Sequence, residues 1–400
     1  MAFTKEYFDE GIYRMGTRCE KWDELRQREG GDILPLWVAD MDFPSPPAVQ
    51  QALLARAAHG TYGYTEAEAD DYQALIDFWA RRHEVTFTRE DVMMIPCVVT
   101  GIRLSLLALT QPGDGVIIQS PVYGPFRFSV QETGRKVLDN PLIRRADGGY
   151  DMDFGHLETL LQQGAKAMIL CSPHNPVSRL WRREELEKLL ALLGRYSVPL
   201  IADEIHADFV YAPEKFVSCL KLEAPRMVTL CAASKTFNLA GLQQASLICR
   251  DAETRQLIQS QMDRAGVRSG NIFALEATRA AYQHGDEWLD ALLGYLDGNR
   301  RLLAELVREH LPQAVLTPME ATYLGWLDLR AYGHDNETLM KLTHRAGVAF
   351  TGGTFFGQER LPAHQYRLPR PLCGRGHPAA EGGPGNGGVN PGHVLCPMGC

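Results

Sequence analysis

Short apolar runs alternate with helix-length segments through the middle of the chain, and this alternation limits the folds open to it. The runs lie at 116–119, 167–171, 198–202, 227–231 and 245–249. Segments with a 3.6-residue period lie at 48–58, 71–82 and 184–195. Because strands separated by helices form βαβ units, we predict an α/β protein with a mainly parallel sheet covered on both faces.

The flanking parts of the chain predict a second, smaller unit. A helical region at about 271–310 is followed by apolar runs at 314–316, 321–329 and 348–351, with a helix at 336–346. Residues 1–34 read as an N-terminal arm with one short helix, and the proline-rich segment 34–47 as an extended loop. We therefore predict an arm with part of the small domain at 1–47, a large domain at 48–290, a small domain at 291–368 and a tail at 369–400.

Composition narrows the class of partners. A content of 45% hydrophobic and 22% charged residues supports a large core, and a net charge of −8 disfavours nucleic acid and anionic membranes as partners. The chain shows neither a secretory signal nor an apolar run of the ~20 residues that span a bilayer. The nine cysteines form no evident disulfide framework. We expect a cytoplasmic protein that binds neither nucleic acid nor membrane.

Polar side chains follow four predicted strands at the point where each strand ends. They are Tyr123, Asn175, Asp203 and Lys235. Each alone has an ordinary explanation, such as a helix cap for an Asp or a solvated surface position for a Lys. Together they predict a pocket, because ligands of open α/β sheets bind beyond the carboxyl ends of the strands. A desolvated Lys235 suits a nucleophile or base, and the set suits a planar cationic cofactor attached through an amine.

Several motifs carry a resemblance to a known family. Ser-Lys-Thr-Phe-Asn-Leu-Ala-Gly at 234–241, Ala-Asp-Glu-Ile-His-Ala-Asp at 202–208 and Cys-Ser-Pro-His-Asn-Pro at 171–176 resemble the fold-type-I pyridoxal-phosphate (PLP) enzymes of aminotransferase class I/II. Trp-Val-Ala-Asp-Met-Asp-Phe at 37–43 and the segments at 59–65 and 321–329 resemble the branch of MalY/PatB-like cystathionine β-lyases, or C–S lyases. The resemblance implies the PLP-dependent transferase-like fold, with a seven-stranded type of sheet and a smaller α/β domain.

The resemblance also implies roles around the cofactor ring. Lys235 would be the catalytic residue, bonded to the cofactor and then free to take the substrate Cα proton. Asp203 would pair with the protonated pyridine nitrogen, Asn175 would donate to the phenolic oxygen, and Tyr123 would stack on the ring. His206 would support Asp203 or the ring from behind.

The phosphate group would be held mainly by main-chain N–H groups. The segment at 97–101, with Val98 and Val99, opens a helix that fits this need, and Ser234 offers a hydroxyl. Gln243 stands where many aminotransferases carry a phosphate-binding Arg. By resemblance Tyr64 would reach the phosphate in the neighbouring subunit, which implies a homodimer, although aromatic packing in a glycine-containing turn is the alternative.

The substrate would be an amino acid. By resemblance Arg367 would bind its α-carboxylate, with donors at Ala39 and Asp40 assisting. The branch implies cleavage of L-cystathionine or a related cysteine S-conjugate to a thiol, pyruvate and ammonia. Transamination uses the same residues and remains an alternative. A regulatory protein that restrains a transcription factor and a folded but inactive protein are further alternatives.

The end of the chain departs from the family. Fifteen of the 32 residues at 369–400 are Gly or Pro, which predicts a disordered tail. The match stops after residue 368, so we interpret the tail as the product of a changed reading frame, with a natural tail as the alternative. Its cysteines and histidines have no standard metal spacing, and we predict no metal site.

Overall fold

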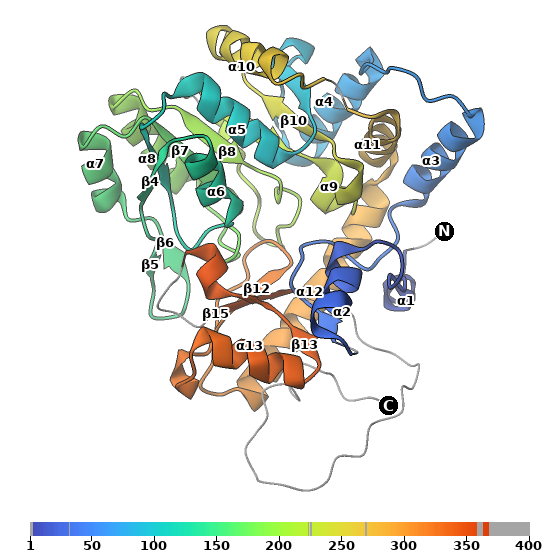
Figure 1. Cartoon of the computed structure of the whole chain (residues 1–400), viewed down its shortest axis with the longest axis vertical. Helices are drawn as coiled ribbons and strands as arrows, with labels where there is room; N and C mark the ends of the chain where they lie inside the picture. Colours follow the sequence, from blue (N-terminus) through green and yellow to red (C-terminus); the bar gives the residue numbers. More distant parts are fainter. Residues whose placement is uncertain are drawn as a thin grey trace, which may run out of the picture. The chain divides into compact units, whose positions relative to one another are not determined.

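The computed structural model describes residues 3–31, 33–222, 224, 226–268, 270–357 and 363–367, which divide into two compact units (Figure 1). The first unit holds the chain up to Pro44, Ala291–Thr317 and the chain from Tyr323. The second unit holds Ser45–Asp290 and Pro318–Thr322. The tail predicted at 369–400 lies outside the described residues.

The second unit contains most of the helices and the large sheet. Its helices are α3 (Pro47–His59), α4 (Ala69–His83), α5 (Val98–Leu109), α6 (Pro125–Glu132), α7 (Phe154–Gln162), α8 (Arg183–Arg195), α9 (Ala233–Thr236), α10 (Ala252–Arg264) and α11 (Ile272–His284). Its strands are β2 (Val92–Ile95), β3 (Gly115–Ile118), β4 (Lys136–Asp139), β5 (Ile143–Arg144), β6 (Tyr150–Asp151), β7 (Ala167–Cys171), β8 (Leu200–Asp203), β9 (Val228–Cys231) and β10 (Ala245–Ile248). Asp153, Asp251 and Asn271 begin α7, α10 and α11 by accepting main-chain N–H bonds.

Seven of the described strands of this unit form one sheet in the order β2-β10-β9-β8-β7-β3-β4, while β5 and β6 pair with each other. The pairs β9–β8, β8–β7, β7–β3 and β3–β4 are parallel, and β10 runs antiparallel to both of its neighbours. The predicted mainly parallel α/β sheet is therefore confirmed. The carboxyl ends of the parallel strands and the start of β10 share one edge, which we call the carboxyl edge.

The sheet is buried along its centre. Every residue of β7, β8, β9 and β10 is buried, as expected for strands covered on both faces. Helix α5 packs against β2, β7, β8, β9 and β10. Gly101 permits this approach, since a Cβ there would lie 2.5 Å from Ile95 Cδ1 and 2.6 Å from Leu230 Cδ2. The close packing holds the start of α5 at the carboxyl edge.

The structure departs from the sequence expectations at several elements. The helical region expected at 271–310 breaks at Gly285 into α11 and α12 (Asp286–His310). A Cβ at Gly285 would lie 2.3 Å from Phe237 Cε1, so the absence of a side chain at Gly285 allows this aromatic ring to pack close to the backbone. Strands β2 and β4 were not predicted; β4 is a half-exposed edge strand with charged ends, which weakens its apolar signal.

The first unit is a smaller α/β assembly. Besides most of α12, its elements are α1 (Lys5–Glu10), α2 (Leu25–Glu29), α13 (Asn336–Arg345), β1 (Leu34–Pro35), β11 (Val315–Leu316), β12 (Leu324–Asp328), β13 (Val348–Ala349), β14 (Thr351–Gly352) and β15 (Ala363–Arg367). The order β11-β12-β15-β14 makes one sheet, and β1 pairs with β13. The arm expected to contain one short helix contains α1, a π-helical turn η1 (Glu20–Glu24) and α2.

One short segment of the second unit comes from a distant part of the chain. In Pro318–Thr322, the Ala321 N–H donates to the Ser178 carbonyl (3.1 Å) and the Thr322 N–H donates to the Phe209 carbonyl (2.7 Å). The hydroxyls of Ser178 and Thr322 lie 2.8 Å apart. Both residues adopt positive φ, at 53° and 58°, a conformation that is strained for a residue with a Cβ. Local hydrogen bonds thus hold this returning segment in the second unit.

None of the described helices combines the length and apolar character that crossing a membrane needs.

Candidate functional site

Four of the predicted site residues lie on segments that meet at the carboxyl edge. Asp203 is the last residue of β8 and pairs in register with Cys171 of β7 and Leu230 of β9. Lys235 lies on α9, directly after β9, and Asn175 follows β7. The Tyr123 N–H donates to the Asn175 carbonyl (3.2 Å), which joins the loop after β3 to the loop after β7. The backbone therefore brings the four predicted segments together.

Asp203 is a buried acid with an unusual environment. Asp203 is 4% exposed, and its Oδ1 accepts a hydrogen bond from the Ile205 N–H at 3.1 Å. Burial raises the pKa of Asp203 to about 7, while the Ile205 N–H and the Lys235 charge act in the opposite direction. A cationic N–H group placed against this carboxylate would offset the desolvation and favour its charged form.

Lys235 and His206 complete the polar centre of the edge. Lys235 is half-buried, and its positive charge acts on both Asp203 and His206. Burial, with a smaller effect of the Lys235 charge, lowers the pKa of His206 to about 3, so the imidazole is neutral at pH 7. The edge thus combines an amine, a buried carboxyl group and a neutral imidazole, three groups able to exchange or orient protons.

The loop after β7, which carries Asn175, is held from several sides. The His174 ring Nε2 lies 2.9 Å from the Pro121 carbonyl oxygen, and the His174 N–H donates to the Arg179 carbonyl (2.8 Å). The Trp181 indole N–H donates to the Cys171 carbonyl (2.9 Å). These bonds fold residues 172–181 back on themselves, so the position of Asn175 depends on Arg179 and Trp181.

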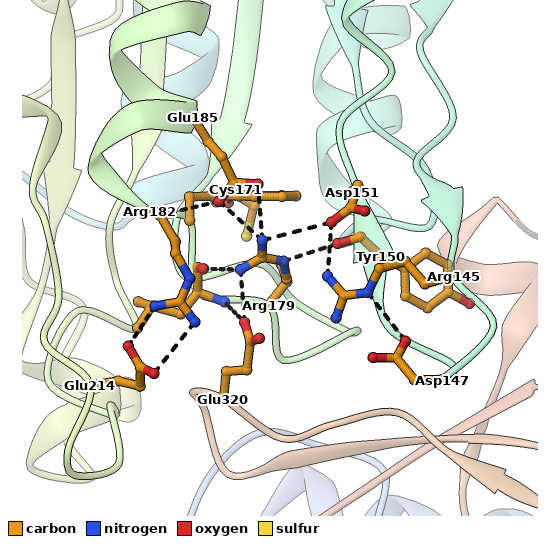
Figure 2. Close-up of polar contacts among 12 residues, drawn as sticks. Arg145, Asp147, Tyr150, Asp151, Cys171, Arg179, Arg182, Glu185, Glu214 and Glu320 are labelled. Atoms are coloured by element: carbon orange, nitrogen blue, oxygen red, sulfur yellow. Dashed lines mark hydrogen bonds and ion pairs between the residues drawn. The ribbon is translucent and has the colours of Figure 1, made fainter.

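Arg179 is the centre of an ion-pair network that the sequence did not indicate (Figure 2). Its guanidinium bonds Glu185 (2.9 and 3.0 Å), Glu320 (2.9 Å) and the Tyr150 carbonyl (2.9 Å). The Leu180 N–H also donates to Glu320 (3.0 Å). Because Glu320 belongs to the returning segment Pro318–Thr322, Arg179 ties that segment to the Asn175 loop.

The start of α5 lies at the same edge and offers main-chain N–H groups. Val98 is buried and Val99 is half-buried, so their backbone rather than their side chains would meet a ligand. Ser234 is half-buried at the start of α9. Gln243 precedes β10 with φ of 58°, and its Nε2 donates to the Ala240 carbonyl (3.2 Å). An anion at this edge would thus meet uncharged donors at these positions.

Tyr62 and Tyr64 lie between α3 and α4, and the structure separates their roles. The Tyr62 hydroxyl donates to the Ala57 carbonyl (2.8 Å), and its ring lies 5.4 Å from that of Phe273. Packing within one chain therefore explains Tyr62. Tyr64 is fully exposed, which places its ring where a second molecule could meet it.

Asp40 and Arg367 belong to the first unit. Asp40 bonds Arg14 (2.7 Å), and its N–H donates to the Val38 carbonyl (2.9 Å). The Ala39 carbonyl accepts the Tyr323 hydroxyl (3.1 Å). Arg367 ends β15 and pairs in register with Leu324. The Asp40 carboxylate and N–H are thus occupied by this chain's own groups.

The described residues contain no group of three His, Cys, Asp or Glu side chains placed to hold a metal ion. The metal-ligand candidates weighed in the sequence lie outside the described residues. They are Cys373, His377, His393, Cys396 and Cys400.

The fold and the edge place the chain in a class of mixed α/β enzymes. The model of the family described as aminotransferase class I and II matches residues 31–367, and the chain belongs to that family. Among curated relatives, the cystathionine beta-lyase PatB of Bacillus subtilis (strain 168) is 38% identical, over 88% of this chain and 92% of its own length.

Solved structures agree with this assignment. Cystalysin from Treponema denticola, whose crystal structure contains pyridoxal 5'-phosphate, superposes with a TM-score of 0.87 at 28% identity, covering 90% of this chain and 93% of its own. The PLP-bound C–S lyase from Staphylococcus hominis has a TM-score of 0.84 at 29% identity, with the same coverage. The fold class predicted from the sequence and the resemblance to this family are therefore confirmed.

Proposed function

We propose that this chain is a PLP-dependent carbon–sulfur β-lyase that converts L-cystathionine or a related cysteine S-conjugate and water to a thiol, pyruvate and ammonia. The observation that carries the proposal is the half-buried Lys235 beside the buried Asp203 at the carboxyl edge. The names of the relatives, a cystathionine beta-lyase and a C–S lyase, support the choice of reaction.

The residues of the edge fit this cofactor. When bound, pyridoxal phosphate supplies an electron sink that stabilises negative charge at the Cα of an amino acid. The buried Asp203 carboxyl, with its pKa raised to about 7, would be matched by a protonated ring nitrogen. Asn175 and Tyr123 would orient the ring, and the N–H groups of Val98 and Val99 with the Ser234 hydroxyl would hold the phosphate.

Lys235 is the group of this chain that we assign to the proton transfers. Its Nζ would take the proton from the substrate Cα, and departure of the Cβ thiolate would follow. His206 is uncharged at neutral pH and would support the ring side of the edge without adding positive charge. We assign Arg367 to the substrate α-carboxylate, as its place at the end of β15 and the family resemblance suggest.

The proposed lyase reaction can be distinguished from transamination by whether a keto-acid acceptor is required. The purified protein loaded with pyridoxal phosphate is expected to release pyruvate from L-cystathionine without any added keto acid, because the sulfur leaving group departs from the same molecule. L-Alanine, which lacks a Cβ leaving group, is the matched control and is expected to give no pyruvate. Pyruvate that appears from L-alanine only with a keto-acid acceptor, and none from L-cystathionine, would establish an aminotransferase.

We also propose a homodimer in which Tyr64 completes the neighbouring site. The full exposure of Tyr64 supports this proposal. Lys235→Ala and Tyr64→Ala subunits, each weak alone, are expected to recover about a quarter of the native activity when co-expressed, since a mixed dimer contains one complete site. Sedimentation should give about twice the chain mass of 44.6 kDa. A monomer, or mixed subunits no more active than their parents, would contradict the shared site.

We propose a cytoplasmic location. Its support is that the six cysteines within the described part of the chain are all free thiols, as expected in a reducing compartment.

A further inference from the structure

The residue that follows Lys235 is tied to a buried carboxylate. The Thr236 hydroxyl donates to Asp208 Oδ2 at 2.6 Å, and Thr236 is 1% exposed. Lys235 and Thr236 both belong to α9, a single helical turn, where successive side chains point about 100° apart. A bond that fixes the direction of Thr236 therefore also fixes the direction in which Lys235 leaves the turn.

Asp208 is itself held by a residue from another element. Its Oδ1 lies 2.8 Å from Nε2 of His83, the last residue of α4, and both side chains are buried. Burial alone would raise the pKa of Asp208, but His83 and Thr236 hold it below its ordinary value. Asp208 is therefore an ionised acceptor at neutral pH, and hydrogen bonds to ionised acceptors are short and strong.

An aromatic contact fixes the next position of the chain. The Phe237 ring lies 5.8 Å from that of Phe78 and 6.1 Å from that of Trp288, and Phe237 is fully buried. Gly285 leaves the space that this ring occupies. Thr236 and Phe237 therefore anchor the carboxyl side of the α9 turn, while the charge of Lys235 acts on Asp203 and His206.

We propose that His83, Asp208 and Thr236 form a positioning network for Lys235. This inference rests on the proposed function, because it needs Lys235 to be the amine that meets the cofactor and the substrate. The network does not touch the reacting atoms; it holds α9 so that Nζ lies at the right distance and angle. Small errors in such placement lower the rate of a chemical step far more than they weaken binding.

Thr236→Val tests the network because valine keeps the shape of threonine and removes the hydroxyl. We expect kcat with L-cystathionine to fall about ten- to a hundredfold, with KM changed by less than about threefold. The attachment of pyridoxal phosphate to the cofactor-free protein should slow in parallel. Cofactor attachment can be followed by absorbance and, after borohydride reduction, by the mass of the peptide that contains Lys235. Thr236→Ser keeps the hydroxyl and should restore both rates.

Ser218→Ala is the matched control. The Ser218 hydroxyl donates to the buried carboxylate of Glu204, also at 2.6 Å, but Ser218 begins the short helix Cys219–Lys221 and is not part of α9. Both substitutions should lower the thermal midpoint of the cofactor-free protein by similar amounts. We expect only Thr236→Val to slow cofactor attachment and kcat.

Equal rate losses in Thr236→Val and Ser218→Ala, or no rate loss in Thr236→Val, would overturn the positioning role. A different result would contradict the proposed reaction alone: the native protein attaches the cofactor at Lys235 but releases no pyruvate from L-cystathionine. In that case the attachment rates of the same variants still decide the role of the network. Attachment of the cofactor at another lysine would overturn both proposals.

Discussion

Replacing Lys235 by alanine is expected to lower pyruvate release from L-cystathionine by at least about 10³-fold, the largest loss of activity we expect from one substitution. The change removes the amine that we propose for the attachment of the cofactor and for the transfer of the Cα proton. Because Lys235 is only half-buried, the thermal midpoint of the cofactor-free protein should change little. The absorbance of bound cofactor should shift to that of the unattached aldehyde.

Lys221→Ala is a suitable control for this experiment. Lys221 lies in the same unit and pairs with the exposed Glu84 at 2.9 Å, so its loss removes a lysine charge without touching the carboxyl edge. Activity and cofactor absorbance should stay close to native values. Substantial pyruvate release by Lys235→Ala would mean that another group moves the Cα proton, and the site assignment would have to be abandoned.

Arg179→Ala is expected to cause the largest loss of stability, about 3–5 kcal/mol in the free energy of unfolding. The guanidinium side chain is 7% exposed and bonds Glu185 and Glu320 (Figure 2). Its removal takes the guanidinium away from the partly buried carboxylates of Glu185 and Glu320 and from the Tyr150 carbonyl. Chemical unfolding of the cofactor-free protein, followed by tryptophan fluorescence, measures the effect.

Arg182→Ala provides the comparison from the same part of the fold. Arg182 bonds Glu214 at 2.6 Å, but the two side chains are 49% and 37% exposed. Ion pairs exposed to this degree contribute about 0–1 kcal/mol. A loss in Arg179→Ala no larger than that in Arg182→Ala would show that the network carries little of the stability we ascribe to it.

Much of the large sheet could be predicted because its strands are buried and apolar. The limits of β7 agree with the prediction, whereas β8 begins two residues later than predicted, at Leu200, and ends one residue later, at Asp203. Asp203 stays in the strand because it pairs in register with Cys171. The half-exposed β4 was not predicted because it has no continuous apolar run. The break at Gly285 was not predicted because the helical pattern continues on both sides of it.

Some residues of the candidate site could likewise be predicted from the sequence, and others could not. Tyr123, Asn175, Asp203 and Lys235 could be grouped from the sequence because each follows a strand, and parallel strands share their carboxyl edge. Arg179 and Glu320 are 141 positions apart, and His83 and Asp208 are 125 apart. No local pattern links residues at such separations, so only the folded chain reveals that these pairs support the loop of Asn175 and the turn of Lys235.

The returning segment Pro318–Thr322 affects how the enzyme can be dissected. A fragment made of Ser45–Asp290 alone would contain the whole large sheet, yet it would lack Glu320 and leave Arg179 with one of its carboxylate partners missing. It would also lose the backbone bonds that Ser178 and Phe209 make to Ala321 and Thr322. The large unit is therefore not a module that can be cut out or transplanted as one continuous stretch of gene. A grafted version would need the five-residue peptide supplied again through a designed linker.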